Sequence, residues 1–207
     1  EVRRLKETVQ VFCETGSRMD FDEVVLANHA DEALAILCDA SVEERRILSS
    51  FRYSKNVAIL HEDVTQMPSK RKFWSSWNYI RKNVDDSSPV FVTYWMNKLH
   101  GLQVNKQFFV TLNPVDKIDE KLIKYETEYS HPVFDWKSIE AANQSRSLQG
   151  VNRSWFCGSY MGDGFHEDGL QAGLWVADKL GFDRKEFAVV PFDRLPKRYR
   201  YDGEVAK

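Results

Sequence analysis

The sequence of 207 residues contains little cysteine and no long apolar run. Its three cysteines, Cys13, Cys38 and Cys157, are far apart and in no C-x-x-C spacing. This pattern is neither that of a disulfide framework nor that of a zinc site, so we expect an intracellular, reducing compartment. No apolar run approaches the roughly 18–20 residues that cross a bilayer, so no transmembrane segment is expected.

The chain also lacks an excess of charge of one sign. Its 29 Lys and Arg nearly balance its 31 Asp and Glu, which gives no reason to expect a nucleic-acid partner. Hydrophobic residues make up 43%, enough to expect a packed core. The start, Glu1 to Arg4, has no initiator Met and no signal-peptide core, so we expect a fragment, a processed product or a subunit.

The first fifty residues predict a hairpin followed by short helices. The run Val24–Ala27 is apolar on both faces, which is typical of a strand covered on both sides in a parallel sheet. Ser41 and Glu44 have the spacing of a capping box at the start of a helix. The expected strands are 8–13 and 19–27, and the expected helices are 32–37 and 41–48.

The middle of the chain is rich in aromatic and β-branched residues separated by turn signals. The short spacings favour antiparallel neighbours, so residues 51–130 are interpreted as one antiparallel sheet that can carry a pocket or a lid. The expected strands are 56–62, 74–81, 90–96, 107–112 and 122–129.

The segment Trp155–Leu180 is the most informative part of the sequence. A buried strand at 154–158 enters a glycine-rich loop, and a helix follows at 167–180, ended by Gly181. Such a unit presents free backbone N–H groups to a phosphate, or to a ring carbonyl that becomes anionic. Its glycines are expected to let a ligand approach the backbone. The alternative is a well-capped core helix, and a G-x-G-x-x-G nucleotide fingerprint is not found.

These residues resemble flavin-containing amine oxidoreductases, in the branch of FAD-dependent amine-oxidase-like proteins similar to the flavoprotein domain attached to some plant cyclopropane-fatty-acid synthases. The similar segments run in order along most of the chain, and the last is the most specific. They are FDEVVLANHADEAL (21–34), ERRILSSFRYSKNVAILHED (43–63), MPSKRKFWSSWNY (67–79), VTYWMNKLHGL (92–102), FVTLNP (109–114), HPVFD (131–135) and WFCGSYMGDGFHEDGLQAGLWVADKLG (155–181).

The resemblance implies an α/β (α+β) fold in which a partial FAD-binding lobe carries an inserted, mainly antiparallel-sheet substrate domain. Residues 1–50 and 150–182 would form the C-terminal half of a discontinuous FAD-binding domain. Residues 51–149 would form the substrate domain, with a helix at 135–149, and 183–207 an extended tail. The N-terminal half with the fingerprint would be supplied in cis or in trans, and the fragment alone is expected to be inactive.

The resemblance also implies the residues that contact FAD. Two would lie along the ribityl–pyrophosphate, namely Gly158 and Ser159. Four would form the turn whose backbone N–H faces the pyrimidine carbonyl, namely Gly164, Phe165, His166 and Glu167. Three would lie near the adenosine half, namely Ala27, Asn28 and His29. The His166 ring is a candidate for stabilising negative charge on the reduced flavin, and Glu167 a weaker candidate for a general base.

The function implied is hydride transfer from an unknown small-molecule substrate to flavin N5, with no catalytic residue assigned. An alternative is a flavin-less scaffold or subunit of a larger complex, which the tail segment Arg194–Tyr201 could dock on a protein partner. A third reading is an α+β domain without ligand.

Aromatic residues of the middle segment are candidates for lining an apolar substrate cavity, with ordinary core as the alternative. They are Trp74, Trp77, Tyr79, Tyr94 and Trp95. Tyr94 and Trp95 would point to opposite faces of a regular strand, so not all five can face one pocket. Adjacent residues His61, Glu62 and Asp63 also alternate in direction, so no metal site is expected there.

Overall fold

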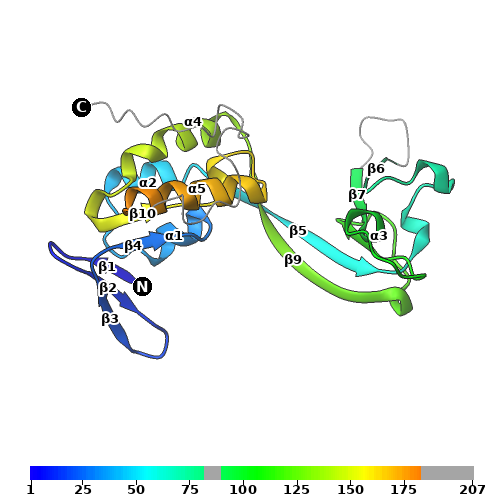
Figure 1. The fold of residues 1–207 in the computed structure, drawn as a ribbon, viewed down its shortest axis with the longest axis horizontal. Coiled ribbons are helices and arrows are strands. Elements are labelled where there is room, and N and C mark those ends of the chain that lie inside the picture. Colours follow the sequence, from blue (N-terminus) through cyan, green and yellow to red (C-terminus); the bar gives the residue numbers. More distant parts are fainter. Residues whose placement is uncertain (82–89, 183–207) are drawn as a thin grey trace. The chain divides into compact units, whose positions relative to one another are not determined.

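The computed structural model describes residues 1–81 and 90–182, shown in Figure 1. The chain divides into two compact units. Unit 1 comprises Glu1–Tyr53 and the chain from Pro132 onward, and unit 2 comprises Ser54–His131. The predicted tail at 183–207, including Arg194–Tyr201, lies outside the described residues.

Unit 1 opens with a three-stranded antiparallel sheet in the order β1-β2-β3. The strands are β1 (Val2–Arg4), β2 (Val9–Phe12) and β3 (Arg18–Phe21). The hairpin between β2 and β3 was predicted, but the second strand was predicted too long. It breaks at Asp22 and Glu23, and the chain resumes as β4 (Val24–Leu26) in a different sheet. The apolar run Val24–Ala27, which follows this break directly, concealed the change of sheet.

Strand β4 pairs in parallel with β10 (Ser154–Phe156), with Val25 opposite Trp155. The parallel arrangement that the Val24–Ala27 pattern predicted is therefore present. The prediction of cover on both sides was wrong for the described residues, since the side of β4 that carries Val25 leaves that residue 43% exposed.

Four α-helices are described in unit 1, and the one after Ser41 begins at the capping box that the sequence predicted. They are α1 (Ala30–Ile36), α2 (Val42–Leu48), α4 (Trp136–Gln144) and α5 (His166–Lys179). At α2 the Glu44 N–H donates to Ser41 Oγ (3.1 Å) and the Ser41 N–H donates to the Glu44 carboxylate (2.7 Å). At α4 the Ser138 N–H donates to Asp135 Oδ1 (2.9 Å). These bonds satisfy N–H groups that a helix cannot satisfy itself.

The core of unit 1 joins residues from both ends of its sequence. Leu48 of α2 and Phe156 of β10 are fully buried in one cluster with Ala141 of α4. Leu148, in a 3-10 turn after α4 (η4, Ser145–Leu148), belongs to the same cluster. Residues 132–149 therefore pack in unit 1, which corrects the predicted boundary between domains at residue 149. The helix there covers apolar side chains of α2 and β10.

Unit 2 is built on a five-stranded sheet in the order β6-β7-β8-β5-β9. The strands are β5 (Arg52–His61), β6 (Trp77–Arg81), β7 (Val90–Trp95), β8 (Phe109–Leu112) and β9 (Ile123–Val133). The β6–β7, β7–β8 and β5–β8 pairs are antiparallel, as the sequence predicted. Short helical segments complete the unit: η1 (Val64–Gln66), η2 (Arg71–Phe73), α3 (Met96–Leu99) and η3 (Glu120–Leu122).

Among the described residues, no helix combines the length and apolar character that crossing a membrane requires. All three cysteines are free thiols, of which Cys157 is buried. Burial raises the pKa of the Cys157 thiol, so this group is neutral.

Candidate functional site

The carboxyl ends of β4 and β10 bring together two segments that are far apart in the sequence. Phe156 lies opposite Leu26, and the Cys157 N–H continues the ladder by donating to the Leu26 carbonyl (3.0 Å). Ala27 and Gly158 therefore leave neighbouring strands at the same edge. In open α/β sheets, ligands bind outside this edge.

The loop after β4 is held by an aromatic stack. The His29 and Tyr53 rings lie 4.3 Å apart at an interplanar angle of 18°. Tyr53 Oη accepts a hydrogen bond from the Ala30 N–H at the start of α1 (2.9 Å). Burial raises the pKa of Tyr53 to about 12, so the hydroxyl stays protonated and keeps a proton to donate.

Two buried polar atoms at this edge have no hydrogen-bond partner within the described residues. They are Asn28 Oδ1, just past β4, and Tyr160 Oη, just past β10. Tyr160 is 3% exposed, and burial raises its pKa. Buried polar atoms are nearly always paired in folded proteins, so each of these points to a water, a ligand or further protein.

The N-terminus of α5, which follows the glycine loop in the sequence, adds backbone N–H donors to the site. The Phe165 N–H is taken by Asp168 Oδ2 (2.8 Å), and the Gly164 N–H by the Ser159 carbonyl (3.1 Å). The N–H groups of His166 and Glu167 have no partner within residues 1–81 and 90–182. Together with the helix dipole, they suit an anionic or carbonyl oxygen.

The glycines of this loop are explained by packing within the chain. A Cβ on Gly158 would lie 2.5 Å from the Tyr160 ring, and one on Gly164 would lie 2.8 Å from the Phe134 ring. A Cβ on Gly162 would meet the carboxylate of Asp168. The expectation that these missing side chains leave room for a ligand was therefore wrong on the Cβ side of all three residues. A Cβ on Gly169 would lie at an ordinary contact distance, 3.6 Å from the Ser159 N, so the packing there does not require glycine.

The two side chains proposed for chemistry differ in their surroundings. His166 is exposed at the first position of α5. The Glu167 carboxylate accepts a hydrogen bond from Gln171 one turn later (2.7 Å). This contact favours the reading of Glu167 as a first-turn helix acid over that of a general base.

The aromatic residues of unit 2 separate onto two faces, as strand alternation predicted. Trp74 and Trp95 contact each other edge to face at 5.2 Å, and Trp74 packs in the same way on Phe109. Arg71 lies 5.3 Å from the Trp74 ring and makes a cation–π contact with it. Trp77, Tyr79 and Tyr94 lie on the opposite face.

The residues His61, Glu62 and Asp63 have three separate environments. His61 bonds Thr111 Oγ1 through Nε2 (2.7 Å), Glu62 pairs with Lys106 and Lys124, and Asp63 accepts from the Thr65 N–H (2.9 Å). No cluster of three or more His, Cys, Asp or Glu side chains arranged to hold a metal occurs in the described part of the chain.

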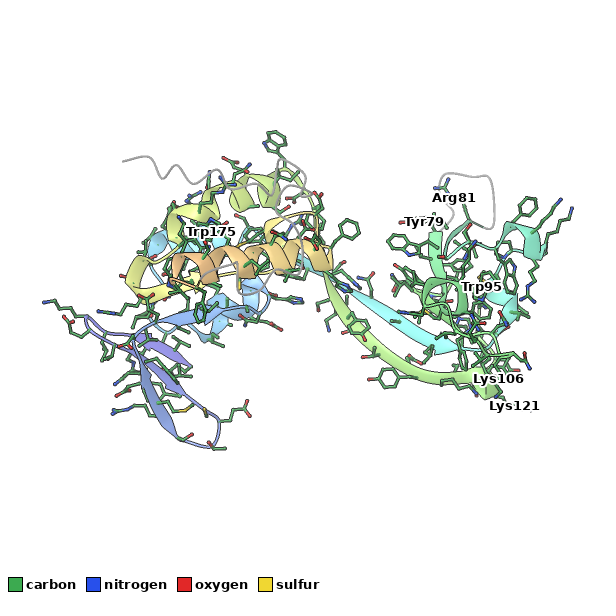
Figure 2. All side chains as sticks on the ribbon, in the orientation of Figure 1. Tyr79, Arg81, Trp95, Lys106, Lys121 and Trp175 are labelled. Carbon is green, nitrogen blue, oxygen red and sulfur yellow. The ribbon has the colours of Figure 1, made fainter. Side chains whose placement is uncertain are left out.

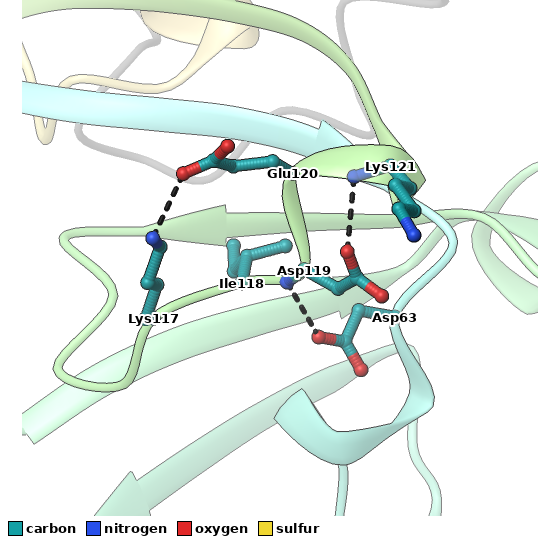
Figure 3. A pocket seen from close by; sticks show the side chains of 6 residues that line it. All are labelled: Asp63, Lys117, Ile118, Asp119, Glu120 and Lys121. Atoms are coloured by element: carbon teal, nitrogen blue, oxygen red, sulfur yellow. Dashed lines mark hydrogen bonds and ion pairs between the residues drawn. The ribbon is translucent and has the colours of Figure 1, made fainter.

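A shallow pocket of about 390 Å³ lies beside Asp63 in unit 2 (Figure 3). Asp63 Oδ2 accepts from the Asp119 N–H (3.1 Å), Asp119 Oδ1 accepts from the Lys121 N–H (3.0 Å), and Lys117 pairs with Glu120 (2.8 Å). These bonds fix the turn before β9 and use the carboxylates of the pocket. We therefore read it as a structural turn.

The comparisons with known proteins identify the fold. No family model and no curated protein matches the sequence. The structure is similar to a conjugated-linoleic-acid-producing (CLA-producing) fatty acid isomerase from P. acnes, with a TM-score of 0.57 and 14% identity over 88% of this chain. It is also similar to cyclohexylamine oxidase from Brevibacterium oxydans IH-35A, with a TM-score of 0.50 and 13% identity over 87% of this chain.

The chain therefore has a mixed α/β architecture of the amine-oxidase-like type. It spans about half the length of both matched proteins, 47% and 48% respectively. At this identity the likeness concerns the fold.

The nearby residues that sequence reasoning missed are Tyr53 and Tyr160. Tyr160 directly follows Gly158 and Ser159, so its place in the sequence was a usable signal. Tyr53 reaches the loop after β4 from the start of β5, and nothing local in the sequence announces that contact.

Proposed function

We propose that this chain forms part of an FAD-dependent oxidoreductase of the amine-oxidase-like class, acting by hydride transfer from a small-molecule substrate to flavin N5. The observation that carries the proposal is the edge of the β4–β10 pair. There, Asn28 Oδ1, a buried carbonyl oxygen with no hydrogen-bond partner among the described residues, follows one parallel strand. The loop that leads to the N-terminus of α5 follows the other.

The residues fit FAD at two of the three expected points. Asn28 Oδ1 has no donor in the part of the chain that the structure describes, so it can accept from a hydroxyl or amino group of the adenosine half. It lies in the loop that His29 stabilises by stacking. The N–H groups of His166 and Glu167, which have no acceptor among the described residues, can donate to a ring carbonyl or phosphate oxygen. The glycine loop fits less well, because Tyr160, Asp168 and Phe134 fill the Cβ sides of its glycines.

When bound, the flavin would supply the hydride acceptor, and the chain's own residues would bind and orient it. Backbone donors at α5 would favour negative charge on the ring edge that they face, because they are fixed before any reaction begins. The Ala27, Ser159, Gly158 and Gly164 backbone and the Phe165 N-cap complete the proposed contact set.

The proposal includes an N-terminal half of the FAD-binding domain, in cis or in trans. The open side of β4 at Val25 supports it, since an added parallel strand and its helix would cover such a surface. The proposed substrate domain is unit 2, whose substrate is proposed only as a small molecule.

One observation favours the second candidate, a flavin-less scaffold derived from such an enzyme. Side chains of this chain occupy the space where a Cβ would lie at Gly158, Gly162 and Gly164. Such packing is expected of a loop that no longer contacts a ligand.

The test is the flavin content of the native full-length protein, measured by visible absorbance and intact mass. We expect bound FAD, and we expect Asn28→Ala to lower the affinity for FAD about tenfold, as loss of one buried hydrogen bond does. Asn143→Ala, at an exposed position of α4, is the matched control and should leave FAD affinity unchanged. A colourless native protein that co-purifies stoichiometrically with another polypeptide would instead establish the scaffold.

A further inference from the structure

An exposed turn of unit 2 carries three consecutive basic residues, Lys70, Arg71 and Lys72, followed by Phe73. We call these four residues the basic turn. All four are exposed, Phe73 by 60%. None of the three cations has a carboxylate partner within the described residues. The turn therefore presents positive charge that the described part of the chain does not neutralise.

Two tryptophan rings hold the Arg71 side chain in place. Its guanidinium lies 5.3 Å from the Trp74 ring and 5.7 Å from the Trp95 ring, which is labelled in Figure 2. The Trp74 ring N–H donates to the Pro68 carbonyl (2.7 Å), and the Trp95 ring N–H donates to Gln107 Oε1 (2.9 Å). Because both rings are fixed, the guanidinium that rests on them loses little further freedom when it meets an anion.

The sequence around the basic turn has a charge balance opposite to that of the whole chain. Residues 64–115 contain seven Lys or Arg and two Asp, whereas the chain has a net charge of -2. Both Asp belong to 82–89, which lies outside the described residues. The two acids just before this segment are engaged, since Glu62 pairs with two lysines and Asp63 is buried. Such a local excess of positive charge attracts an anionic surface.

The exposed aromatic ring of the turn favours a lipid bilayer as the anionic partner. Lys72 Nζ lies 5.2 Å from the centre of the Phe73 ring, so a cation and an apolar side chain are adjacent. A bilayer combines anionic headgroups with an apolar layer just below them, and it binds Lys or Arg beside Phe, Trp or Leu. A free anion would need donors that converge in a pocket. The pocket beside Asp63 is lined by no residue of the basic turn.

The tryptophan contacts argue against a nucleic acid as the partner. Binding of single strands uses open aromatic faces on which bases stack. Here both indoles are half-buried, Arg71 rests on them, and Trp74 packs edge to face on the buried Phe109. These contacts use the ring surface that a base would need.

We propose that the basic turn docks unit 2 on an anionic phospholipid bilayer. The Arg71 guanidinium and the two lysine ammonium groups contact the headgroups, and the Phe73 ring enters the layer just below them. This docking does not require flavin, so it goes beyond the proposed redox function and is tested separately from it.

The test is co-sedimentation of the full chain with large unilamellar vesicles at pH 7. One set consists of phosphatidylcholine alone, and the other contains about 30% phosphatidylserine in about 0.1 M salt. We expect at least about tenfold tighter binding to the second set, and most of that difference should disappear in about 0.5 M salt, because salt screens the charges. Equal binding to both sets, or no binding to either, would overturn the inference.

Charge substitutions locate the contact. Arg71→Gln and Lys72→Gln should each weaken binding to the anionic vesicles about fivefold, the factor that one cation contributes near such a surface. Lys55→Gln removes the same charge from unit 2 at a lysine that pairs with Glu128 (2.9 Å). It is the matched control and should change binding by less than about twofold. An equal loss in the control would overturn the assignment to this turn.

The aromatic ring is tested on its own. Phe73→Ser should weaken binding to the anionic vesicles at least about threefold, and this loss should persist at high salt because apolar burial is not screened. Val42→Ser, at a residue 85% exposed in unit 1, is the matched control and should have no effect. A Phe73→Ser protein that binds vesicles as tightly as the parent chain would overturn the insertion of the ring.

Two further ligands distinguish other sources of negative charge. Displacement of the protein from vesicles by inorganic phosphate, but not by chloride at equal ionic strength, would overturn the inference in favour of a free-anion site. Binding of a single-stranded oligonucleotide without binding of vesicles would overturn it in favour of a nucleic acid. A colourless protein that still binds the anionic vesicles would support the docking surface while removing the proposed redox function, so the two failures are distinguishable.

Discussion

Arg4 and Glu44 form a doubly hydrogen-bonded ion pair inside unit 1, between the first strand and helix α2. One bond joins Arg4 Nη2 to Glu44 Oε2 (2.8 Å), and a second joins Nη1 to Oε1. The two side chains are 2% and 1% exposed. Arg4 also bonds Asp39 through Nε (2.9 Å), so a single guanidinium links β1 to α2 and to the segment before it.

We predict that Glu44→Gln lowers the free energy of unfolding by about 3 kcal/mol, because it leaves a buried guanidinium short of a counter-charge. Glu43→Gln is the matched control on the same helix, since Glu43 pairs with Arg46 at the surface. It should cause no measurable change. Urea unfolding of both variants checks this, and similar midpoints for the two would refute it.

The Gly164 position supports a second prediction. Gly164 has φ +87°, and an added Cβ would lie 2.8 Å from the Phe134 ring. Gly164→Ala should therefore destabilise the chain by about 1–3 kcal/mol, even without FAD. Gly173→Ala, in the interior of α5 with no described atom within 4 Å, should stabilise it by about 0.5–1 kcal/mol. Thermal unfolding of the two variants should show shifts of opposite sign.

A second substitution, at Phe134, tests whether the contact with its ring causes the loss of stability. Adding Phe134→Leu to Gly164→Ala removes the clash while keeping the strained backbone. Partial recovery of stability in the double variant is expected, and full additivity of the two single effects would show that the contact is unimportant.

Local signals in the sequence predicted local structure well. The cap at Ser41 depends on residues three positions apart, so its bonds could be inferred before the fold was known. Strand alternation likewise predicted that Tyr94 and Trp95 face opposite ways, because that follows from backbone geometry alone.

The predictions that failed concerned contacts between segments that are distant in the sequence. The Phe134 ring that fills the space beside Gly164 comes from thirty residues earlier, and no pattern around Gly164 indicates it. The Arg4–Glu44 pair joins residues forty positions apart. For the same reason helix α4 was assigned to the inserted domain, although its Ala141 packs in unit 1.

Two tyrosines of unit 1 allow a prediction with opposite signs. Tyr160 Oη is buried without a described partner, whereas Tyr53 Oη accepts the Ala30 N–H (2.9 Å). Tyr53→Phe should lower the free energy of unfolding by about 1–3 kcal/mol, because it leaves that N–H unpaired. Tyr160→Phe should leave it unchanged or raise it by up to about 1 kcal/mol. Chemical unfolding of the full chain without added flavin is the measurement, and an equal loss in Tyr160→Phe would show that its hydroxyl has a water or protein partner.

A buried histidine in unit 2, His61, predicts a response to acid. The Asp63 N–H donates to His61 Nδ1 (3.1 Å), so Nε2 carries the proton and donates to Thr111 Oγ1 (2.7 Å). Burial lowers the pKa of His61, although the nearby Asp63 opposes that effect. The folded unit therefore holds a neutral ring, and its stability is fully present above the unfolded value of about 6.5.

As the pH falls below about 6.5, the unfolded chain takes up a proton at His61 before the folded chain does, so unit 2 should lose stability progressively. Hydrogen exchange of the Thr93 and Thr111 amides from pH 7 to pH 5 measures this locally, after correction for the intrinsic exchange rate. His61→Gln should remove this part of the pH dependence, and His100→Gln, at an exposed position after α3, should retain it. In unit 1, the Arg4–Glu44 pair should respond only near pH 4.5 and below. There, burial alone would raise the pKa of Glu44, but the bonds from Arg4 and Ser41 lower it overall, so its stabilising charge persists until stronger acid. Loss of protection at the same pH in both units would contradict the assignment to His61.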